Sequence, residues 1–228
     1  MCWRQCLRGY EPMSSDDPIA LKIVVGGGFG VGKTTMIGAV SEIKPLSTEE
    51  TLTSASSGTG TDRLEGIENK ATTTVALDFG RITLQKQNLV LLLFGTPGQQ
   101  RFWFTWDDLS LGAIGAVVLA DTRRLLDCFA AVEYFESRDV PFVVAVNEFD
   151  ADDAYRYSSE EVREALELRA DVPVLLCDAR DPASAKHVLV SLVSYAHSVS
   201  LRRARERAVH TPPPASPLQH SSDLGATS

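Results

Sequence analysis

One short segment near the start of the chain constrains the fold more than any other part of the sequence. Residues 27–34 read Gly-Gly-Phe-Gly-Val-Gly-Lys-Thr, which fits the pattern G-x-x-x-x-G-K-[ST]. An apolar run at 19–26, typical of a buried strand, precedes it, and a predicted helix over 33–43 follows it. A strand, a glycine-rich turn and a helix in this order form a concave site for phosphate groups. A plain glycine-rich turn is the alternative.

Each part of this segment has a chemical role in phosphate binding. The glycines let backbone N–H groups converge on phosphate oxygens, and the following helix presents the positive end of its dipole. Lys33 is predicted to act catalytically on the terminal phosphates, and the Thr34 hydroxyl is a predicted Mg²⁺ ligand. The predicted nucleotide-binding residues of this segment are Gly27, Gly28, Phe29, Gly30, Val31, Gly32, Lys33, Thr34 and Thr35.

Apolar runs alternate with amphipathic stretches along the rest of the chain. The alternation predicts an α/β fold with about six strands in a mainly parallel sheet and helices on both faces. The first two strands after the glycine-rich segment are expected to form a hairpin. Residues 46–61, rich in Ser, Thr and Gly, predict a mobile loop. The further predicted strands are 74–84, 89–94, 113–120, 141–146 and 172–176, and the further predicted helices are 125–138, 159–170 and 183–208.

Composition limits the classes of partner and location. Lys and Arg number 22 against 30 Asp and Glu, and a net charge of −8 argues against a nucleic-acid binder. No apolar run reaches the roughly 18 residues that a spanning helix needs, so a cytoplasmic protein is expected. Cys128 and Cys177 lie in apolar stretches and are predicted to be buried. Residues 1–18 are predicted to be a flexible leader and 209–228 a disordered tail, which leaves one domain over 19–208.

Four further segments resemble the Ras-like small GTPases. Residues 95–102, Gly-Thr-Pro-Gly-Gln-Gln-Arg-Phe, are similar to the second switch D-T-A-G-Q-E-R-F of that superfamily. Residues 74–79 resemble the first-switch segment T-I-G-V-D-F, 147–150 the guanine-reading N-K-x-D, and 177–180 the S-A-K loop. Within the superfamily, Pro97 in the second switch and the departures described below resemble the MglA-like bacterial GTPases most, in particular the actinobacterial members. The resemblance covers about 19–205 and implies a Ras-like P-loop NTPase, with a G domain over 19–208.

The segment at 147–150 has a physical basis for reading guanine. Guanine presents two N–H donors on one edge, and the Asp150 carboxylate can accept both, whereas adenine lacks this pair. Asn147 is expected to brace the loop and to reach the base. The resemblance adds Asp178 and Ala179 as binding residues, with the Ala179 backbone N–H donating to the guanine carbonyl. The alternative is that Asn147 and Asp150 are turn residues after a strand.

The resemblance implies a GTP-binding molecular switch that hydrolyses GTP to GDP slowly with Mg²⁺. Thr74 would complete the Mg²⁺ shell when a γ-phosphate is present, although Thr72 or Thr73 could take this place after a register shift. Gln99 would orient the attacking water as a catalytic residue; an exposed loop amide is the alternative. Candidates for a charge-compensating arginine are Arg101, Arg123 and Arg124, against the alternative of solvated surface charges.

Four features depart from the pattern of the superfamily. Gly95 stands where an Asp holds Mg²⁺ through water, Phe29 places a bulky ring in the phosphate loop, and Glu148 replaces a Lys that packs along the base. The stretch 45–73 is also unusually long. These departures motivate a second hypothesis, a non-hydrolysing nucleotide-binding switch or scaffold, and an ATPase is a third.

Aromatic residues beside the second switch suggest a protein partner. The segment 102–106 holds Phe102, Trp103, Phe104 and Trp106, and four aromatics on one short helix cannot all face inward. This pattern is compatible both with an interface anchor and with a role in the core. The resemblance implies a roadblock-type regulatory protein and a sensor-kinase-like complex as partners, with membrane association only through them.

Overall fold

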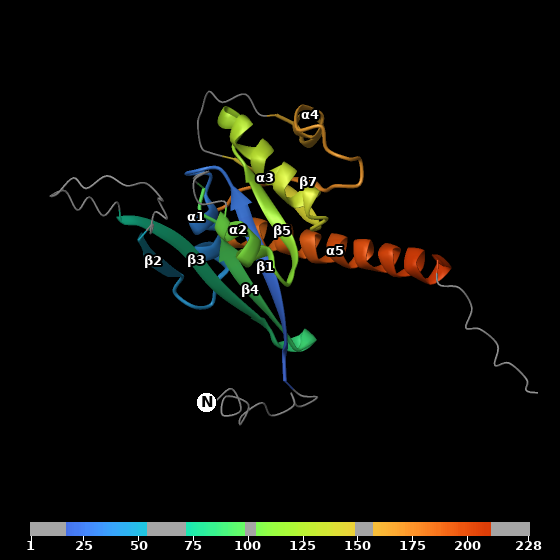
Figure 1. The fold of residues 1–228 in the computed structure, drawn as a ribbon, viewed down its shortest axis with the longest axis horizontal. Coiled ribbons are helices and arrows are strands. Elements are labelled where there is room, and N and C mark those ends of the chain that lie inside the picture. Colours follow the sequence, from blue (N-terminus) through green and yellow to red (C-terminus); the bar gives the residue numbers. More distant parts are fainter. Residues whose placement is uncertain (1–16, 54–71, 99–103, 149–156, 211–228) are drawn as a thin grey trace, which may run out of the picture.

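The apolar run before the glycine-rich segment forms β1, the middle strand of a seven-stranded sheet (Figure 1). The computed structural model describes residues 17–53, 72–98, 104–148 and 157–210. The strand order across the sheet is β2-β3-β4-β1-β5-β6-β7. The strands are β1 (Ile19–Gly27), β2 (Leu46–Thr53), β3 (Thr72–Leu84), β4 (Leu89–Gly95), β5 (Ala113–Ala120), β6 (Phe142–Asn147) and β7 (Val174–Cys177).

The sheet is mainly parallel, as the sequence predicts. β1 pairs in parallel with β4 and β5, and the parallel pairing continues through β6 to β7. β3 is antiparallel to both β2 and β4, so β3 and β4 form the predicted hairpin. Because the parallel strands share one direction, the turns that follow β1, β5, β6 and β7 meet at one edge of the sheet.

The strand β2 corrects one sequence prediction. Residues 46–53 pair with β3 from Leu46 opposite Phe79 to Thr53 opposite Thr72, and do not form the predicted mobile loop. The segment lies at the edge of the sheet, where backbone hydrogen bonds to one neighbour hold a strand that lacks apolar alternation. This strand also raises the count from about six to seven. The remainder of that predicted loop, 54–61, lies outside the described residues.

Helices cover both faces of the sheet (Figure 1). Helices α1 and α5 pack on one face against Ile23 and Val25 of β1, while α2, α3 and α4 pack on the other against Val24. Two apolar layers therefore enclose the sheet, and β1 contributes alternate side chains to each. The helices are α1 (Lys33–Val40), α2 (Phe104–Ser110), α3 (Leu126–Ser137), α4 (Ser159–Ala165) and α5 (Pro182–His210), with 3₁₀ turns at η1 (Gln85–Gln87) and η3 (Thr122–Arg124).

Helix α4 ends five residues earlier than the predicted boundary at 170. Glu167 adopts the left-handed conformation with φ of 52°, which ends the helix although its side chain favours helix. The Leu168 N–H then donates to the Arg163 carbonyl at 3.0 Å, and the Arg163 guanidinium donates to the Val172 carbonyl at 2.6 Å. These bonds fix the path toward β7, so the contacts of Arg163 set the helix end.

Both cysteines predicted to be buried are buried, since Cys128 and Cys177 each expose 1% of their surface. Burial raises the pKa of the Cys128 thiol to about 11. No helix among the described residues combines the length and apolar character needed to cross a membrane. Strand β1 begins at Ile19 and helix α5 ends at His210, and the predicted single domain over 19–208 stays a prediction.

The close approach of β5, the start of β6 and α5 yields a stability prediction. A Cβ atom on Gly115 would lie 2.8 Å from the Pro141 carbonyl oxygen and 2.9 Å from Leu192 Cδ1. We expect Gly115→Ala to lower the free energy of unfolding by about 1–3 kcal/mol, measured by urea denaturation. The control is Gly38→Ala in α1, where the new Cβ meets Pro45 Cγ at an ordinary 3.6 Å. It should raise stability by about 0.5–1 kcal/mol. Equal effects of the two changes would contradict the packing described.

Candidate functional site

The glycine-rich segment between β1 and α1 requires its glycines. Gly27, Gly30 and Gly32 have φ values of 132°, 73° and 105°, a region that other residues rarely adopt. A Cβ on Gly27 would lie 2.5 Å from the Leu119 carbonyl oxygen of β5. The loop therefore turns sharply over the end of the sheet, and helix α1 begins at Lys33 directly behind it. This is the strand–loop–helix arrangement that the sequence predicts for phosphate binding.

Lys33 lies buried inside the loop. Its ammonium donates to the carbonyl oxygens of Gly27 at 3.0 Å and of Gly28 at 2.6 Å, and the residue exposes only 8% of its surface. Burial lowers the pKa of Lys33 to about 8, while the negative charge of Asp78 acts in the opposite direction. A buried ammonium held by neutral carbonyls is a receptor for an anion, because phosphate oxygens stabilise its charge.

A cavity of about 400 Å³ opens beside Lys33. It is lined by the loop, by the start of α1, by Asp78 of β3 and by the segment after β4. The Thr34 hydroxyl donates to Asp78 Oδ2 at 2.5 Å across this cavity. Asp78 is a site residue that the sequence analysis missed, although it lies in the segment compared with the first switch. The lining residues are Phe29, Gly30, Gly32, Lys33, Thr34, Thr35, Asp78, Thr96, Pro97 and Gly98.

The oxygen atoms around this cavity fit a magnesium ion. Thr34 and Asp78 offer a hydroxyl and a carboxylate, which are ligand types that Mg²⁺ prefers. The Thr96 hydroxyl oxygen is buried and has no hydrogen-bond partner among the described residues. The described residues hold no cluster of three His, Cys, Asp or Glu that could bind a metal alone. Mg²⁺ in nucleotide sites commonly takes further ligands from phosphate oxygens and water, so a hydroxyl and a carboxylate are compatible with such an ion.

Asn147, at the end of β6, joins the phosphate loop to the turn after β7. Its side-chain amide donates to the Val31 carbonyl at 3.0 Å, and its oxygen accepts from the Ala179 N–H at 3.0 Å. The predicted bracing role of Asn147 is therefore present in the structure. The Ala179 N–H donates to Asn147 here, and its contact with the guanine carbonyl stays a prediction. The Asp178 carboxylate is also engaged, by the Arg180 guanidinium at 2.8 Å, which lowers its pKa to about 2.

Three predicted residues cannot be placed in full. Gln99 and Asp150 lie outside the described residues, so their roles in catalysis and base selection stay predictions. The backbone of Thr74 lies in β3 opposite Thr51, whereas its side chain is not described. In the strand Thr74 lies four residues before Asp78, about 13 Å away along β3. A metal contact by Thr74 stays a prediction.

The structure separates the candidate arginines. Arg124, at the end of η3, donates to the Phe29 carbonyl of the phosphate loop at 2.5 Å. Arg123 instead forms an ion pair with Asp121 at 2.8 Å, and Arg101 lies outside the described residues.

Two of the aromatic residues beside the second-switch segment differ in their exposure to solvent. Trp106 is buried and its indole N–H donates to the Pro97 carbonyl at 3.2 Å, whereas Phe104 is 61% exposed.

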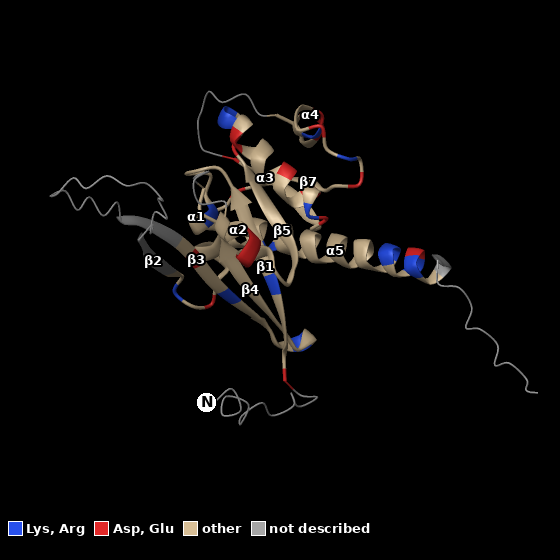
Figure 2. Cartoon of the chain, viewed as in Figure 1, with Lys and Arg blue, Asp and Glu red and all other residues tan. Residues whose placement is uncertain are grey.

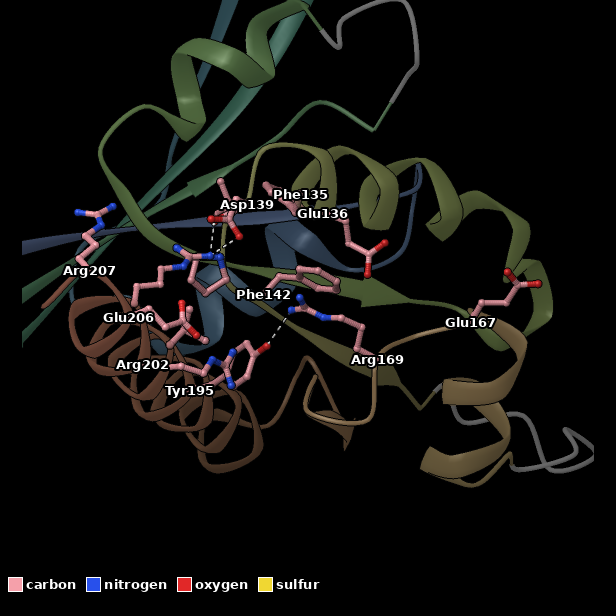
Figure 3. Close-up of a pocket in the computed structure, with 14 residues that line it drawn as sticks. Phe135, Glu136, Asp139, Phe142, Glu167, Arg169, Tyr195, Arg202, Glu206 and Arg207 are labelled. Atoms are coloured by element: carbon pink, nitrogen blue, oxygen red, sulfur yellow. Dashed lines mark hydrogen bonds and ion pairs between the residues drawn. The ribbon is translucent and has the colours of Figure 1, made fainter. Parts of the chain in front are cut away.

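A larger cavity, of about 820 Å³, lies at the opposite edge of the sheet, before β6 and beside α5 (Figure 3). Charged residues dominate its wall, and two of them form an ion pair with each other. Arg203 binds Asp139, and the Arg169 guanidinium donates to the Tyr195 hydroxyl at 3.4 Å. Figure 2 shows the mixed charges on the last turns of α5. Because this cavity lacks the glycine-rich loop and the buried lysine, we assign phosphate binding to the smaller cavity beside Lys33.

The bridge formed by Asn147 gives a prediction for stability. Asn147→Asp keeps the side-chain shape but removes the amide donor to the Val31 carbonyl, which would leave a buried acceptor without its partner. We expect the free energy of unfolding to fall by about 1–3 kcal/mol, measured by urea denaturation. The control is Gln87→Ala, which removes an exposed amide from η1 and should change stability by less than about 0.5 kcal/mol. Equal stability of Asn147→Asp and the unaltered protein would show that the bridge contributes nothing to the free energy of unfolding.

Comparisons with known proteins agree with this arrangement. A search of curated proteins finds no match. Among solved structures, the chain is similar to the G domain of the T. maritima FeoB iron transporter, with 18% identity, TM-score 0.52, and coverage of 78% of this chain and 99% of that one. The FeoB G domain from Methanococcus jannaschii gives 12% identity, TM-score 0.52 and the same coverage.

The cytosolic domain of the T. maritima FeoB transporter in its apo form is similar at 16% identity and TM-score 0.53, with 78% of this chain covered. The match spans only 64% of the length of that cytosolic domain. These likenesses show a P-loop fold of the G-domain type. A family model described as "Conserved hypothetical ATP binding protein" matches residues 25–199. The chain is therefore a nucleotide-binding P-loop protein, and it belongs to this family of conserved hypothetical ATP-binding proteins.

Proposed function

We propose that the protein is a GTP-binding molecular switch that hydrolyses GTP slowly with Mg²⁺. The observation that carries this proposal is the Asn147 bridge. It joins the phosphate loop at Val31 to the turn after β7 at Ala179, and so places the end of β6 beside the loop that holds Lys33. A base bound next to the phosphates would lie at this edge, within reach of the segment that follows β6. That segment contains Asp150, the predicted guanine-reading carboxylate.

A second candidate is an ATP-binding protein, and the description of the family favours it. The two candidates differ in the edge of the purine that the protein must recognise. Guanine offers two adjacent N–H donors to one carboxylate, whereas adenine offers a single amino group next to a ring acceptor. The Asn-Glu-Phe-Asp segment at 147–150 favours guanine on this chemistry. We therefore propose GTP as the ligand and treat ATP as the competing outcome.

Competition between nucleotides tests this choice. In displacement of a fluorescent GDP analogue, we expect GTP and GDP to compete more strongly than ATP by about 10²-fold or more. Lys33→Ala should abolish binding of all of them because it removes the buried cation of the phosphate loop. Lys44→Ala, which removes an exposed lysine outside the cavity, is the matched control. Stronger competition by ATP would favour the second candidate.

The role of Asp150 is tested in the same assay. An amide at this position can no longer accept from both guanine donors, but it can donate to the carbonyl that xanthine carries in place of the amino group. Asp150→Asn should therefore lose preference for GTP and gain affinity for xanthosine triphosphate. Asp152→Asn is the neighbouring control. Unchanged selectivity of Asp150→Asn would remove the basis for guanine recognition by this residue.

Hydrolysis is the second part of the proposal. Thr34 and Asp78 would hold the magnesium ion, which neutralises phosphate charge when it is bound. Gln99 would orient the attacking water, and Lys33 would stabilise charge on the terminal phosphates. Among the described arginines, Arg124 contacts the phosphate loop, at the Phe29 carbonyl, and we propose it as the charge-compensating residue. Turnover without any charge-compensating arginine is expected on the order of 10⁻⁴ s⁻¹.

Single-turnover hydrolysis of GTP tests the role of Arg124. Arg124→Ala should lower the rate of phosphate release by about 10²-fold, with a much smaller change in nucleotide affinity, because the guanidinium acts on charge that develops in the transition state. Arg205→Ala in α5, at the other edge of the sheet, should have no effect. An unchanged rate in Arg124→Ala would exclude this role. No measurable hydrolysis by the unaltered protein would support the alternative of a non-hydrolysing switch, which Gly95 and Phe29 motivate.

Membership of the MglA-like bacterial GTPases and a cytoplasmic location remain part of this proposal. So does a roadblock-type regulator in a sensor-kinase-like complex, with no nucleic-acid partner and with membrane contact only through other proteins. The exposed Phe104 side chain, next to the second-switch segment, supports a protein interface there. Trp106 does not contribute to such a surface, because it is buried against Tyr134 and Phe135 of α3.

A further inference from the structure

The carboxylate that the Ras-like pattern expects at the end of β4 is absent, because residue 95 is glycine. The structure places another carboxylate at the same point of the sheet. Asp78 of β3 lies directly opposite Gly95 in the antiparallel pairing of β3 with β4. The two residues therefore share one position across the hairpin, at the edge that carries the phosphate loop.

The Asp78 side chain fills the space beside Gly95. A Cβ atom on Gly95 would lie 3.0 Å from Asp78 Cβ and 3.3 Å from Asp78 Oδ2. It would also lie 3.1 Å from Cδ1 of Ile37 in α1. A carboxylate at 95 and one at 78 would compete for the same volume and would repel each other. The absence of a side chain at 95 is what gives Asp78 its room.

The polar contacts of Asp78 direct it toward the predicted metal ligand. Asp78 Oδ2 accepts a hydrogen bond from the Thr34 hydroxyl at 2.5 Å, and Asp78 lines the 400 Å³ cavity together with Lys33 and Thr96. A carboxylate from a neighbouring strand thus reaches the hydroxyl that a P-loop offers to Mg²⁺. Glycine at position 95 offers no carboxylate to a metal ion, and the register of the hairpin places the Asp78 carboxylate at this point instead.

We propose that Asp78 supplies the carboxylate of the magnesium site, in place of the residue at position 95. This inference rests on the proposed function, since the ion would bind together with the phosphates of the nucleotide. It assigns to β3 a role that the Ras-like pattern gives to the end of β4. It also makes the hairpin register part of the site, because a shift of one residue would turn the Asp78 side chain to the other face.

The test measures how much Mg²⁺ tightens nucleotide binding. The dissociation constant of a fluorescent GDP analogue is determined with excess EDTA and with millimolar MgCl₂, for the full chain and its variants. Asp78→Asn keeps the shape and an acceptor for Thr34 but removes the charge. We expect affinity in EDTA to be retained and the tightening by Mg²⁺ to fall by about tenfold or more. Asp108→Asn in α2, away from the cavity, should behave as the unaltered protein.

A carboxylate exchange separates a metal role from a purely structural one. In the double variant Asp78→Gly/Gly95→Asp, the new side chain at 95 enters space that Asp78 has vacated, with the flexible end of Ile37 as its nearest remaining neighbour. We expect this variant to regain most of the Mg²⁺ effect that Asp78→Gly alone loses. A residue that merely positions Thr34 would not transfer its function across the hairpin in this way. The exchange also keeps the question open to measurement if Asp78→Asn does not fold.

Each outcome bears on the inference. Full Mg²⁺ tightening in folded Asp78→Asn overturns it, and so does a folded exchange variant that shows no more Mg²⁺ effect than Asp78→Gly. Loss in the single variants with recovery in the exchange supports it. If the unaltered protein binds no guanine nucleotide either with EDTA or with MgCl₂, the proposed function itself is wrong. The assignment of Asp78 is then wrong as well, because it rests on that function.

Discussion

The phosphate loop at the edge of the sheet must hold one buried cation, the ammonium of Lys33, and the rest of the site is arranged around it. The Lys33 ammonium is removed from solvent and is held by two backbone carbonyls of the loop that precedes it. Burial of a charge with incomplete compensation is costly, and the lowered pKa of Lys33, at about 8, expresses this cost. The loop can take this shape because its glycines adopt positive φ. A phosphate group is the ligand that resolves the imbalance, which explains why the strand, the loop and the helix occur together.

Three elements converge on residues 29–31 of the loop. Arg124 after β5 donates to the Phe29 carbonyl, and Asn147 at the end of β6 donates to the Val31 carbonyl. Gly98, after β4, packs so closely on the loop that a Cβ there would lie 2.8 Å from the Phe29 backbone. A ligand that moves this part of the loop would disturb all three contacts at once. These contacts join the phosphate loop to segments at the ends of three strands, and the proposed switch would act through them.

The sequence predicts those parts of the fold that depend on local patterns. The phosphate loop, the buried strands and the helices α1, α3 and α5, together with the start of α4, follow from glycine placement and apolar periodicity. The sequence prediction fails where contacts between distant segments determine whether an element forms or where it ends. Strand β2 has no apolar alternation and exists through its pairing with β3, and α4 ends where Arg163 binds the following loop. Asp78 was missed for the same reason, since its position opposite Gly95 follows from the register of the β3–β4 hairpin. That hairpin was predicted, so its register could have revealed the residue.

The central claim is that a guanine nucleotide binds along the edge formed by the phosphate loop and the ends of β6 and β7. Hydrogen exchange followed by mass spectrometry, with and without GTP and Mg²⁺, tests this claim most directly. We expect slower exchange in peptides that cover residues 27–35, 147 and 178–180, and no change in peptides around Asp139 and Arg203. Unchanged exchange at the loop, or protection confined to the charged cavity at the opposite edge, would contradict it.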